Sequence, residues 1–238
     1  PRARALLKAE LKALREQLFD SEHSSNRWMV FDRLAVYDPA FATDFLKQWV
    51  EPEEGWEYVA FGHVLVSSLA RKMNHDRTRY LKVLLDAKDP FVRVGAAIYL
   101  SFDEPEEGLL QLKELAGLPG EPGAWAALNV VRRGDGSALP RAFEVLKIPG
   151  IGHMSGMMNM NLQSRVEILV SNIAHLSGVP PPAFPEPISF KEWERGSEGT
   201  APWYQKLYGN YLGWWQTYKD RLVIEDPWFE ELKAQRVD

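Results

Sequence analysis

Four of the six methionines of this chain lie in one short segment, residues 149–161, together with a histidine. These side chains suit a soft metal, because thioether sulfur is a ligand that Cu(I) prefers and imidazole is a common metal ligand. Methionine also packs adaptably in loops and at pliable binding surfaces. We favour loop packing over partner contact or a copper site, and therefore predict no bound metal. The residues concerned are His153, Met154, Met157, Met158 and Met160.

A second group of candidates is a set of cations in an otherwise acidic chain. One cluster lies near a predicted turn and a second lies one or two helical pairs later: Arg71, Lys72, His75, Arg77, Arg79 and Lys82, then Arg132, Arg133 and Arg141. If these turns stack, the cations form a ridge that could bind phosphate or carboxylate groups. We favour the simpler expectation that they are solvated and complement the C-terminal ends of helices.

Patterns that define common enzyme sites are incomplete in this sequence. The absence of cysteine excludes thiolate zinc sites, cysteine nucleophiles and disulfides. Gly150 and Gly152 have part of the dinucleotide-binding spacing but follow a helical pattern instead of a strand. Ser155 stands one place too late for a nucleophile elbow. The sequence thus predicts a protein that is not an enzyme and uses no cofactor.

Charge and hydropathy exclude two classes of partner. The chain has 238 residues and a net charge of −5, and its field would repel nucleic acid and anionic membranes. No apolar run approaches the roughly 18 residues of a membrane-spanning helix, and no signal peptide is evident. We expect a soluble protein, either cytoplasmic or, since cysteine is absent, extracytoplasmic after removal of a leader.

The elements that position these side chains are organised around an internal repeat in residues 89–146. Two copies are offset by about 30 residues, because Ala96-Ala97 aligns with Ala126-Ala127 and Leu109 aligns with Leu139. Each copy predicts two antiparallel helices joined by a short turn. Small residues on the first helix allow close packing, and Gly134 suits the left-handed conformation at a helix end.

Earlier segments repeat the helical pattern more loosely. Apolar residues at helical spacing predict helices over residues 1–19, 26–37, 39–50, 54–71 and 77–87. Asp38-Pro39 and Asp89-Pro90 each predict a helix start, with aspartate as the cap and proline in the first turn. One such pair cannot bury its own apolar face, so neighbouring pairs must stack.

The repeat resembles a known family. Val92-Arg93-x-Gly95-Ala96-Ala97 and Ala126-Ala127, followed by Gly134-Asp135, are similar to bacterial HEAT repeats of the phycobilisome-lyase-like, armadillo-like type over residues 89–147. The resemblance implies an all-α fold: a right-handed α-solenoid of stacked antiparallel helix pairs, with about four to five repeats. It also implies a protein that binds a partner, and it supplies no catalytic residues.

The C-terminal region differs in composition. Residues 179–187 hold five prolines, and residues 189–238 hold five of the nine tryptophans and four of the eight tyrosines. A helix over residues 202–218 is too apolar on all sides to stand free in water. We therefore expect a repeat domain at 1–178, a Pro-rich connector at 179–188, and an aromatic-rich C-terminal cap at 189–238 that packs on the solenoid.

The function we expect is a non-enzymatic scaffold that binds a protein or peptide partner on the concave face of the solenoid. The candidate contacts are Arg79, Lys82, Trp125, Arg132, Arg133 and Arg141, with the tryptophan as an anchor. The alternative is a HEAT-like enzyme or small-ligand-binding protein, with a pocket between the Met-rich segment and the aromatic tail lined by His153, Met157, Trp214 and Trp215. Some HEAT-like proteins are DNA glycosylases, and the acidic net charge disfavours that function here.

Overall fold

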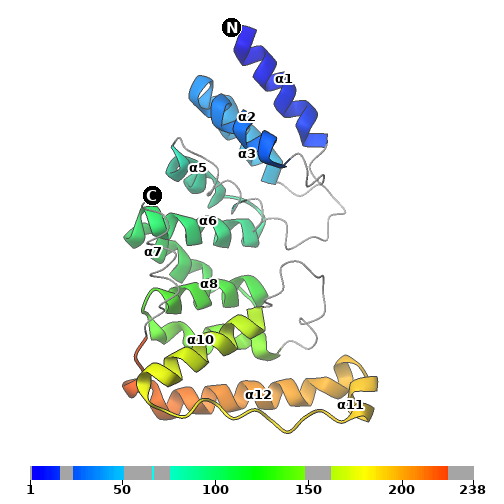
Figure 1. The fold of residues 1–238 in the computed structure, drawn as a ribbon, viewed down its shortest axis with the longest axis vertical. Helices are drawn as coiled ribbons and strands as arrows, with labels where there is room; N and C mark the ends of the chain where they lie inside the picture. Colours follow the sequence, from blue (N-terminus) through cyan, green and yellow to red (C-terminus); the bar gives the residue numbers. More distant parts are fainter. Residues whose placement is uncertain (1, 17–23, 51–65, 67–75, 148–161, 225–238) are drawn as a thin grey trace. The chain divides into compact units, whose positions relative to one another are not determined.

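The structure of this protein is a computed structural model that describes residues 2–16, 24–50, 66, 76–147 and 162–224 (Figure 1). All regular structure in these residues is helical, with no strand. The predicted all-α class is confirmed. The chain divides into two compact units, Pro1–Gln111 and Leu112–Asp238, and each is described on its own.

The N-terminal unit is built from α-helices that pack mainly on their neighbours in sequence. They are α1 (Arg2–Glu16), α2 (Ser24–Tyr37), α3 (Pro39–Val50), α5 (Arg77–Leu84), α6 (Pro90–Asp103) and α7 (Pro105–Leu115), the last of which crosses into the second unit. Large buried side chains such as Phe31 and Tyr80 form its core, with their rings 5.3 Å apart edge to face. Gly95 lies against Val66, where an added Cβ would come within 3.3 Å of that side chain.

Both predicted aspartate caps are present. Asp89 accepts a hydrogen bond of 2.8 Å from the Phe91 N–H at the start of α6. Asp38 accepts one of 3.3 Å from the Phe41 N–H at the start of α3. Asp38 also binds α1, because Arg4 Nε and Lys8 Nζ lie 2.6 and 2.7 Å from its Oδ2. One carboxylate thus ties α1 to the junction between α2 and α3.

Acid is expected to weaken this tie. The Arg4 side chain, then Lys8 and the Phe41 N–H, lower the pKa of Asp38 to about 2, against about 3.9 in an unfolded chain. A carboxyl whose pKa is lower in the folded state contributes stability above the unfolded pKa and loses it as pH falls toward the folded pKa. We predict that the difference in urea midpoint between the wild type and Asp38→Asn stays constant from about pH 7 to 5 and narrows from about pH 4 to 2.

Arg4→Gln removes the main cause of the shift and serves as the matched variant. Its own difference from the wild type should narrow over the same pH range. If the difference in urea midpoint between the wild type and Asp38→Asn does not change down to about pH 2, the lowered pKa of Asp38 is contradicted.

The C-terminal unit contains the second copy of the repeat and the aromatic tail. Its elements are α8 (Gly120–Arg132), η2 (Gly136–Ala138), α9 (Leu139–Ala142), η3 (Phe143–Lys147), α10 (Leu162–Ser177), α11 (Phe190–Glu194), α12 (Ser197–Tyr218) and η5 (Lys219–Arg221). The predicted helix over residues 139–146 is a single α-helical turn that tightens into a 3₁₀ helix. Gly134 has φ +92°, as its position at the end of α8 requires.

The core of this unit lies between α8, α9, η3, α10 and α12. Alanines 124 and 127 of α8 are buried in it, as the packing argument for small residues predicts. From α12 it includes Leu207, Tyr211 and Trp214. The crowded aromatic helix therefore buries one face against the helices that precede it.

Candidate binding surface on the C-terminal unit

An extended segment lies along α12 and is called the strap here, defined as residues 179–188 (Figure 1). Every third residue of it faces inward: Val179, Pro182 and Pro185 are buried, and the two residues after each of them are exposed. A period of three residues is that of a polyproline II helix. The strap is thus packed along its length and is not a free linker.

Polar side chains of α12 donate hydrogen bonds to main-chain carbonyl groups of the strap. The pairs are Trp203 Nε1 to Glu186 O at 2.7 Å, Asn210 Nδ2 to Ala183 O at 2.7 Å, and Trp214 Nε1 to Pro180 O at 2.6 Å. The donors follow one another at steps of seven and four residues, which places them on one face of the helix. The acceptors follow at steps of three in the opposite direction, so one helix face binds one edge of the strap, whose three-residue period is that of a polyproline II helix.

Buried aromatic contacts hold α12 in position. The Tyr211 ring lies 5.5 Å from that of Phe143 in an edge-to-face arrangement, and burial raises the pKa of Tyr211. The Tyr208 hydroxyl donates a 2.9 Å hydrogen bond to Glu144 Oε1, while Lys147 Nζ lies 4.5 Å from the Tyr208 ring centroid. These contacts fix α12 against η3 and so fix the row of donors.

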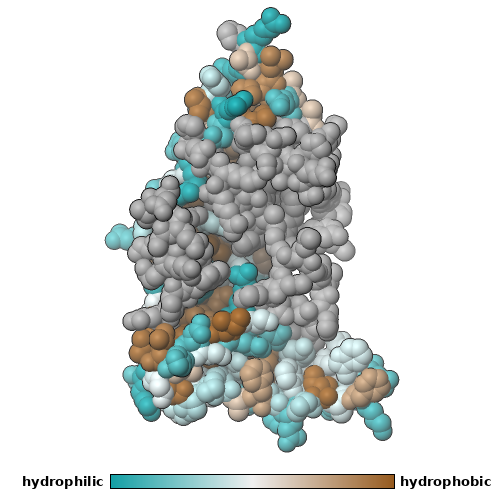
Figure 2. All heavy atoms as spheres, viewed as in Figure 1, coloured by the Kyte–Doolittle hydropathy of each residue, from teal (hydrophilic) through white to brown (hydrophobic). Residues whose placement is uncertain are grey.

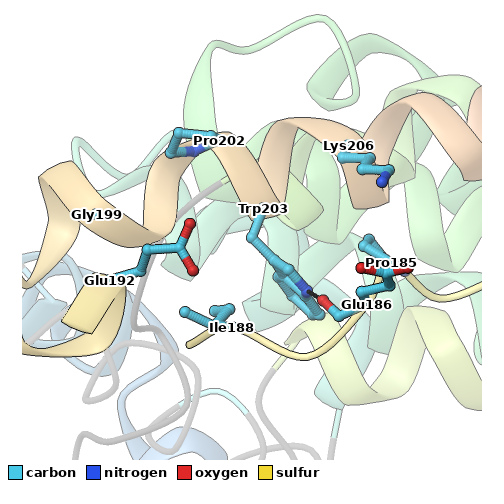
Figure 3. A pocket seen from close by; sticks show the side chains of 8 residues that line it. All are labelled: Pro185, Glu186, Ile188, Glu192, Gly199, Pro202, Trp203 and Lys206. Carbon is cyan, nitrogen blue, oxygen red and sulfur yellow. Dashed lines mark hydrogen bonds between the residues drawn. The ribbon is translucent and has the colours of Figure 1, made fainter. Parts of the chain in front are cut away.

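A pocket opens where the end of the strap meets α11 and α12 (Figure 3). Its volume is about 200 Å³, and its lining consists of Pro185, Glu186, Ile188, Glu192, Gly199, Pro202, Trp203 and Lys206. Figure 3 shows the Glu192 carboxylate and the Trp203 indole directed toward this space from α11 and α12. Ser189 donates to that carboxylate through its hydroxyl and its N–H, at 2.6 and 2.9 Å, and lowers the pKa of Glu192. The pocket therefore has the ionised Glu192 in its wall, together with the charged residues Glu186 and Lys206 and several apolar residues.

The same short helix exposes a pair of aromatic side chains. Phe190 is 72% and Trp193 59% exposed, and their rings are stacked at a centroid distance of 6.3 Å and an angle of 22°. A capping box between Ser189 and Glu192 holds α11. Figure 2 shows hydrophobic side chains at the surface around this end of α12, among hydrophilic ones. An exposed, ordered aromatic pair of this kind is typical of a contact surface.

The two predicted site residues of the N-terminal unit differ in what surrounds them. Lys82 Nζ lies 2.8 Å from carboxylate oxygens of both Glu104 and Glu107, which raise its pKa. Arg79 is half exposed and lies 3.8 Å from an oxygen of Asp76. Lys82 is therefore engaged within its own unit, while Arg79 extends into solvent.

Of the predicted cations in the C-terminal unit, Arg141 has a clear structural use. Its guanidinium donates to the Ala116 carbonyl at 2.9 Å and to that of Leu118, so it binds the carbonyls that follow α7. Arg132 and Arg133 are half-buried at the end of α8. These contacts resemble the complementing of a helix end by a cation, but the Arg141 guanidinium is part-buried and not solvated as expected.

The tryptophans predicted as binding residues are buried or half-buried, whereas a contact surface requires exposed side chains. Trp125 is half-buried on α8, with the Arg165 guanidinium 5.0 Å from its ring centroid. Trp214 is only 6% exposed, and Trp215 packs at the edge of the same core. His153 and Met157 lie outside the described residues, as do the methionines around them. The structure thus brings none of these tryptophans together as an open site.

Of the residues that form the surface described above, only Trp214 was in the predicted set. Trp203 and Asn210 share a helical stripe with Trp214, and the buried prolines of the strap have the spacing Pro-x-x-Pro. Those two patterns were available in the sequence and are signals for polyproline II recognition. Their pairing was not, because the register between two segments depends on the three-dimensional packing.

Two other features are absent from the described part of the chain. It contains no cluster of three or more His, Cys, Asp or Glu side chains that could hold a metal ion. None of its helices is both long enough and apolar enough to cross a membrane. No protein-family model, curated protein or solved structure matches this chain.

Proposed function

We propose that this chain is a non-enzymatic scaffold of HEAT-like helical pairs that binds a protein or peptide partner. In this proposal the pairs stack as a right-handed α-solenoid, and the aromatic tail acts as its C-terminal cap. Of the cations considered for the concave face, the half-exposed Arg79 remains a candidate for partner contact. Lys82 and Arg141 do not, since each is bound within its own unit.

The observation that carries the proposal is the stacked pair of Phe190 and Trp193. Large aromatic side chains supply much of the binding energy at protein interfaces, and tryptophan is enriched among the residues that dominate it. Here two such rings stand in solvent on a helix whose own backbone is fixed by the Ser189–Glu192 capping box. A partner would bury them at little cost in ordering, because their positions are already set.

The adjoining pocket favours a protein side chain over a metabolite. Its volume of about 200 Å³ is below the roughly 300–1,000 Å³ of ordinary small-molecule sites. Apolar walls from Pro185, Ile188 and Pro202 suit one aliphatic side chain, and the Glu192 carboxylate suits a neighbouring donor group. We therefore propose that a partner inserts one side chain here and covers the aromatic pair with the flanking residues.

Replacing both rings by serine, Phe190→Ser with Trp193→Ser, is expected to weaken partner capture strongly without unfolding the chain. Loss of one dominant interface aromatic costs about 2 kcal/mol, which corresponds to binding about 30-fold weaker. Loss of both aromatics should therefore weaken binding by about 30-fold or more. The measurement is quantitative recovery of bound proteins from an extract of the source cells on immobilised wild type and on the variant.

The matched control changes two other exposed apolar side chains of the same unit, Ile168→Ser with Leu176→Ser on α10. A partner that binds at α11 is recovered equally by the wild type and by this control. Equal recovery by all three proteins, or loss only with the α10 control, would rule out the α11 surface.

A further inference from the structure

We infer that the face of α12 carrying Trp203, Asn210 and Trp214 is a binding site for a polyproline II segment of Pro-x-x-Pro type, occupied in this chain by its own strap. The site is separate from the exposed pair on α11 and has a different occupant. Its recognition elements are three side-chain donors and two buried proline positions, Pro182 and Pro185.

The dimensions of the two partners agree. Six residues of a polyproline II helix, from residue 180 to 186, span about 19 Å at about 3.1 Å per residue. Eleven residues of an α-helix, from 203 to 214, span about 16.5 Å at about 1.5 Å per residue. The donor row and the acceptor row therefore match to within about 2–3 Å over their whole length, a difference that the length of the indole and amide side chains covers.

The contacts specify backbone geometry more than sequence. All three hydrogen bonds end on main-chain carbonyl oxygens, which any polyproline II segment presents with the same threefold period. Sequence enters through the inward positions, of which two are prolines and the others are Val179 and Ile188. A segment with prolines three residues apart and aliphatic residues at the flanking inward positions has the matching chemistry, and aromatic surfaces with hydrogen-bond donors are the usual sites for it.

Because the strap and α12 belong to one chain, the strap determines the concentration at which a segment from another chain can bind. A tethered strap acts at an effective concentration of about millimolar, so a segment supplied by another chain competes with it only at comparable concentration. Release of the strap also removes Pro185, Glu186 and Ile188 from the pocket wall. Displacement of the strap by a Pro-x-x-Pro segment therefore changes the lining of that pocket.

The first test uses a variant of the full chain in which residues 179–188 are replaced by a Gly-Ser linker of the same length. The probe is a fluorescein-labelled synthetic peptide with the sequence of residues 178–189, titrated in fluorescence anisotropy. We expect the linker variant to bind it at least about tenfold more tightly than the intact chain, because the competing strap is absent. Asn210→Ala in the linker variant should weaken binding, and a peptide with Pro182→Asp and Pro185→Asp should not bind.

The second test keeps the strap in place and so does not depend on how well the linker variant folds. Because the chain has no cysteine, Ala183→Cys gives a single labelling site on an exposed strap residue whose carbonyl accepts from Asn210. A dye quenched by nearby indoles is attached there, and millimolar unlabelled peptide is expected to raise its fluorescence by displacing the strap. The aspartate-substituted peptide should leave the fluorescence unchanged.

Absence of peptide binding to a folded linker variant would overturn the inference. So would a labelled strap that the peptide does not release, if the linker variant does not fold. A concentration-dependent dimer of the intact chain that disappears in the linker variant would identify a second copy as the occupant, and would likewise refute binding of a partner's segment.

Discussion

Trp214→Ala is expected to destabilise the C-terminal unit by about 3–5 kcal/mol, the usual cost of truncating a large buried aromatic side chain. Trp214 is 6% exposed, lies in the core with Leu207 and Tyr211, and donates its indole N–H to the Pro180 carbonyl at 2.6 Å. The substitution leaves a cavity between α12 and the strap and an unpaired carbonyl at Pro180. Both effects act on the contact between the strap and α12, so hydrogen exchange should become faster in both segments.

The measurement is urea unfolding followed by circular dichroism, with hydrogen exchange of α12 and strap peptides to locate the loss. Trp214→Phe, which keeps most of the ring volume, should cost only about 1 kcal/mol for the hydrogen bond. Trp193→Ala removes an exposed tryptophan and should change stability by less than about 0.5 kcal/mol. A similar cost at positions 193 and 214 would mean that Trp214 does not hold the strap.

Gly123→Ala is the second substitution with a large expected effect. A Cβ at this position in the first turn of α8 would overlap the Leu118 carbonyl and come 2.5 Å from Arg141 Nη2. Overpacking usually costs about 1–3 kcal/mol. We expect at least the upper end of that range, because the obstacle is backbone and because displacing Arg141 also breaks its bonds to the carbonyls of Ala116 and Leu118.

Gly209→Ala in α12 is the matched control, because no described atom lies within 4 Å of the Cβ it would add. Alanine is the better helix former by about 1 kcal/mol, so this change should stabilise the chain slightly. The measurement is the midpoint of thermal unfolding, which should fall for Gly123→Ala and rise slightly for Gly209→Ala relative to the wild type. If Gly123→Ala proves neutral, the close approach of α8 to Arg141 is wrong.

Local features of this fold could be predicted because they depend on residues close in sequence. Asp38 and Asp89 cap helices through their own chain neighbours, and Gly134 adopts the positive φ that a helix end requires. The predicted start of the aromatic helix, by contrast, is wrong. The sequence predicts a helix over residues 202–218, whereas α12 begins at Ser197 and contains Pro202.

Two contacts with residues a few positions earlier accompany that earlier start. Gly199 packs so closely on α11 that a Cβ would overlap the Glu192 carbonyl, and this contact lets the first turn of α12 form before the proline. Thr200 adds a 3.0 Å hydrogen bond from its hydroxyl to the Gly196 carbonyl. Neither partner is identifiable from helical periodicity.

The candidate site was predicted less well than the fold. Arg141 and Lys82 are predicted contacts because they are charged groups near turns, whereas the structure shows both engaged within their units. Composition does reveal the proline run and the concentration of aromatics that follows it. The residues that matter in each, Pro182 and Pro185 against Trp203 and Asn210, emerge only when the register of the strap on α12 is known.

The central claim, that a partner binds at the α11 surface, is tested most directly by site-specific photocrosslinking. Benzoylphenylalanine is placed at Trp193 in one protein and at Leu176 of α10 in another, and each is irradiated in extract of the source cells. The account predicts a discrete adduct of one partner from position 193 and none from position 176. Adducts of equal yield from both positions, or from position 176 alone, would contradict it.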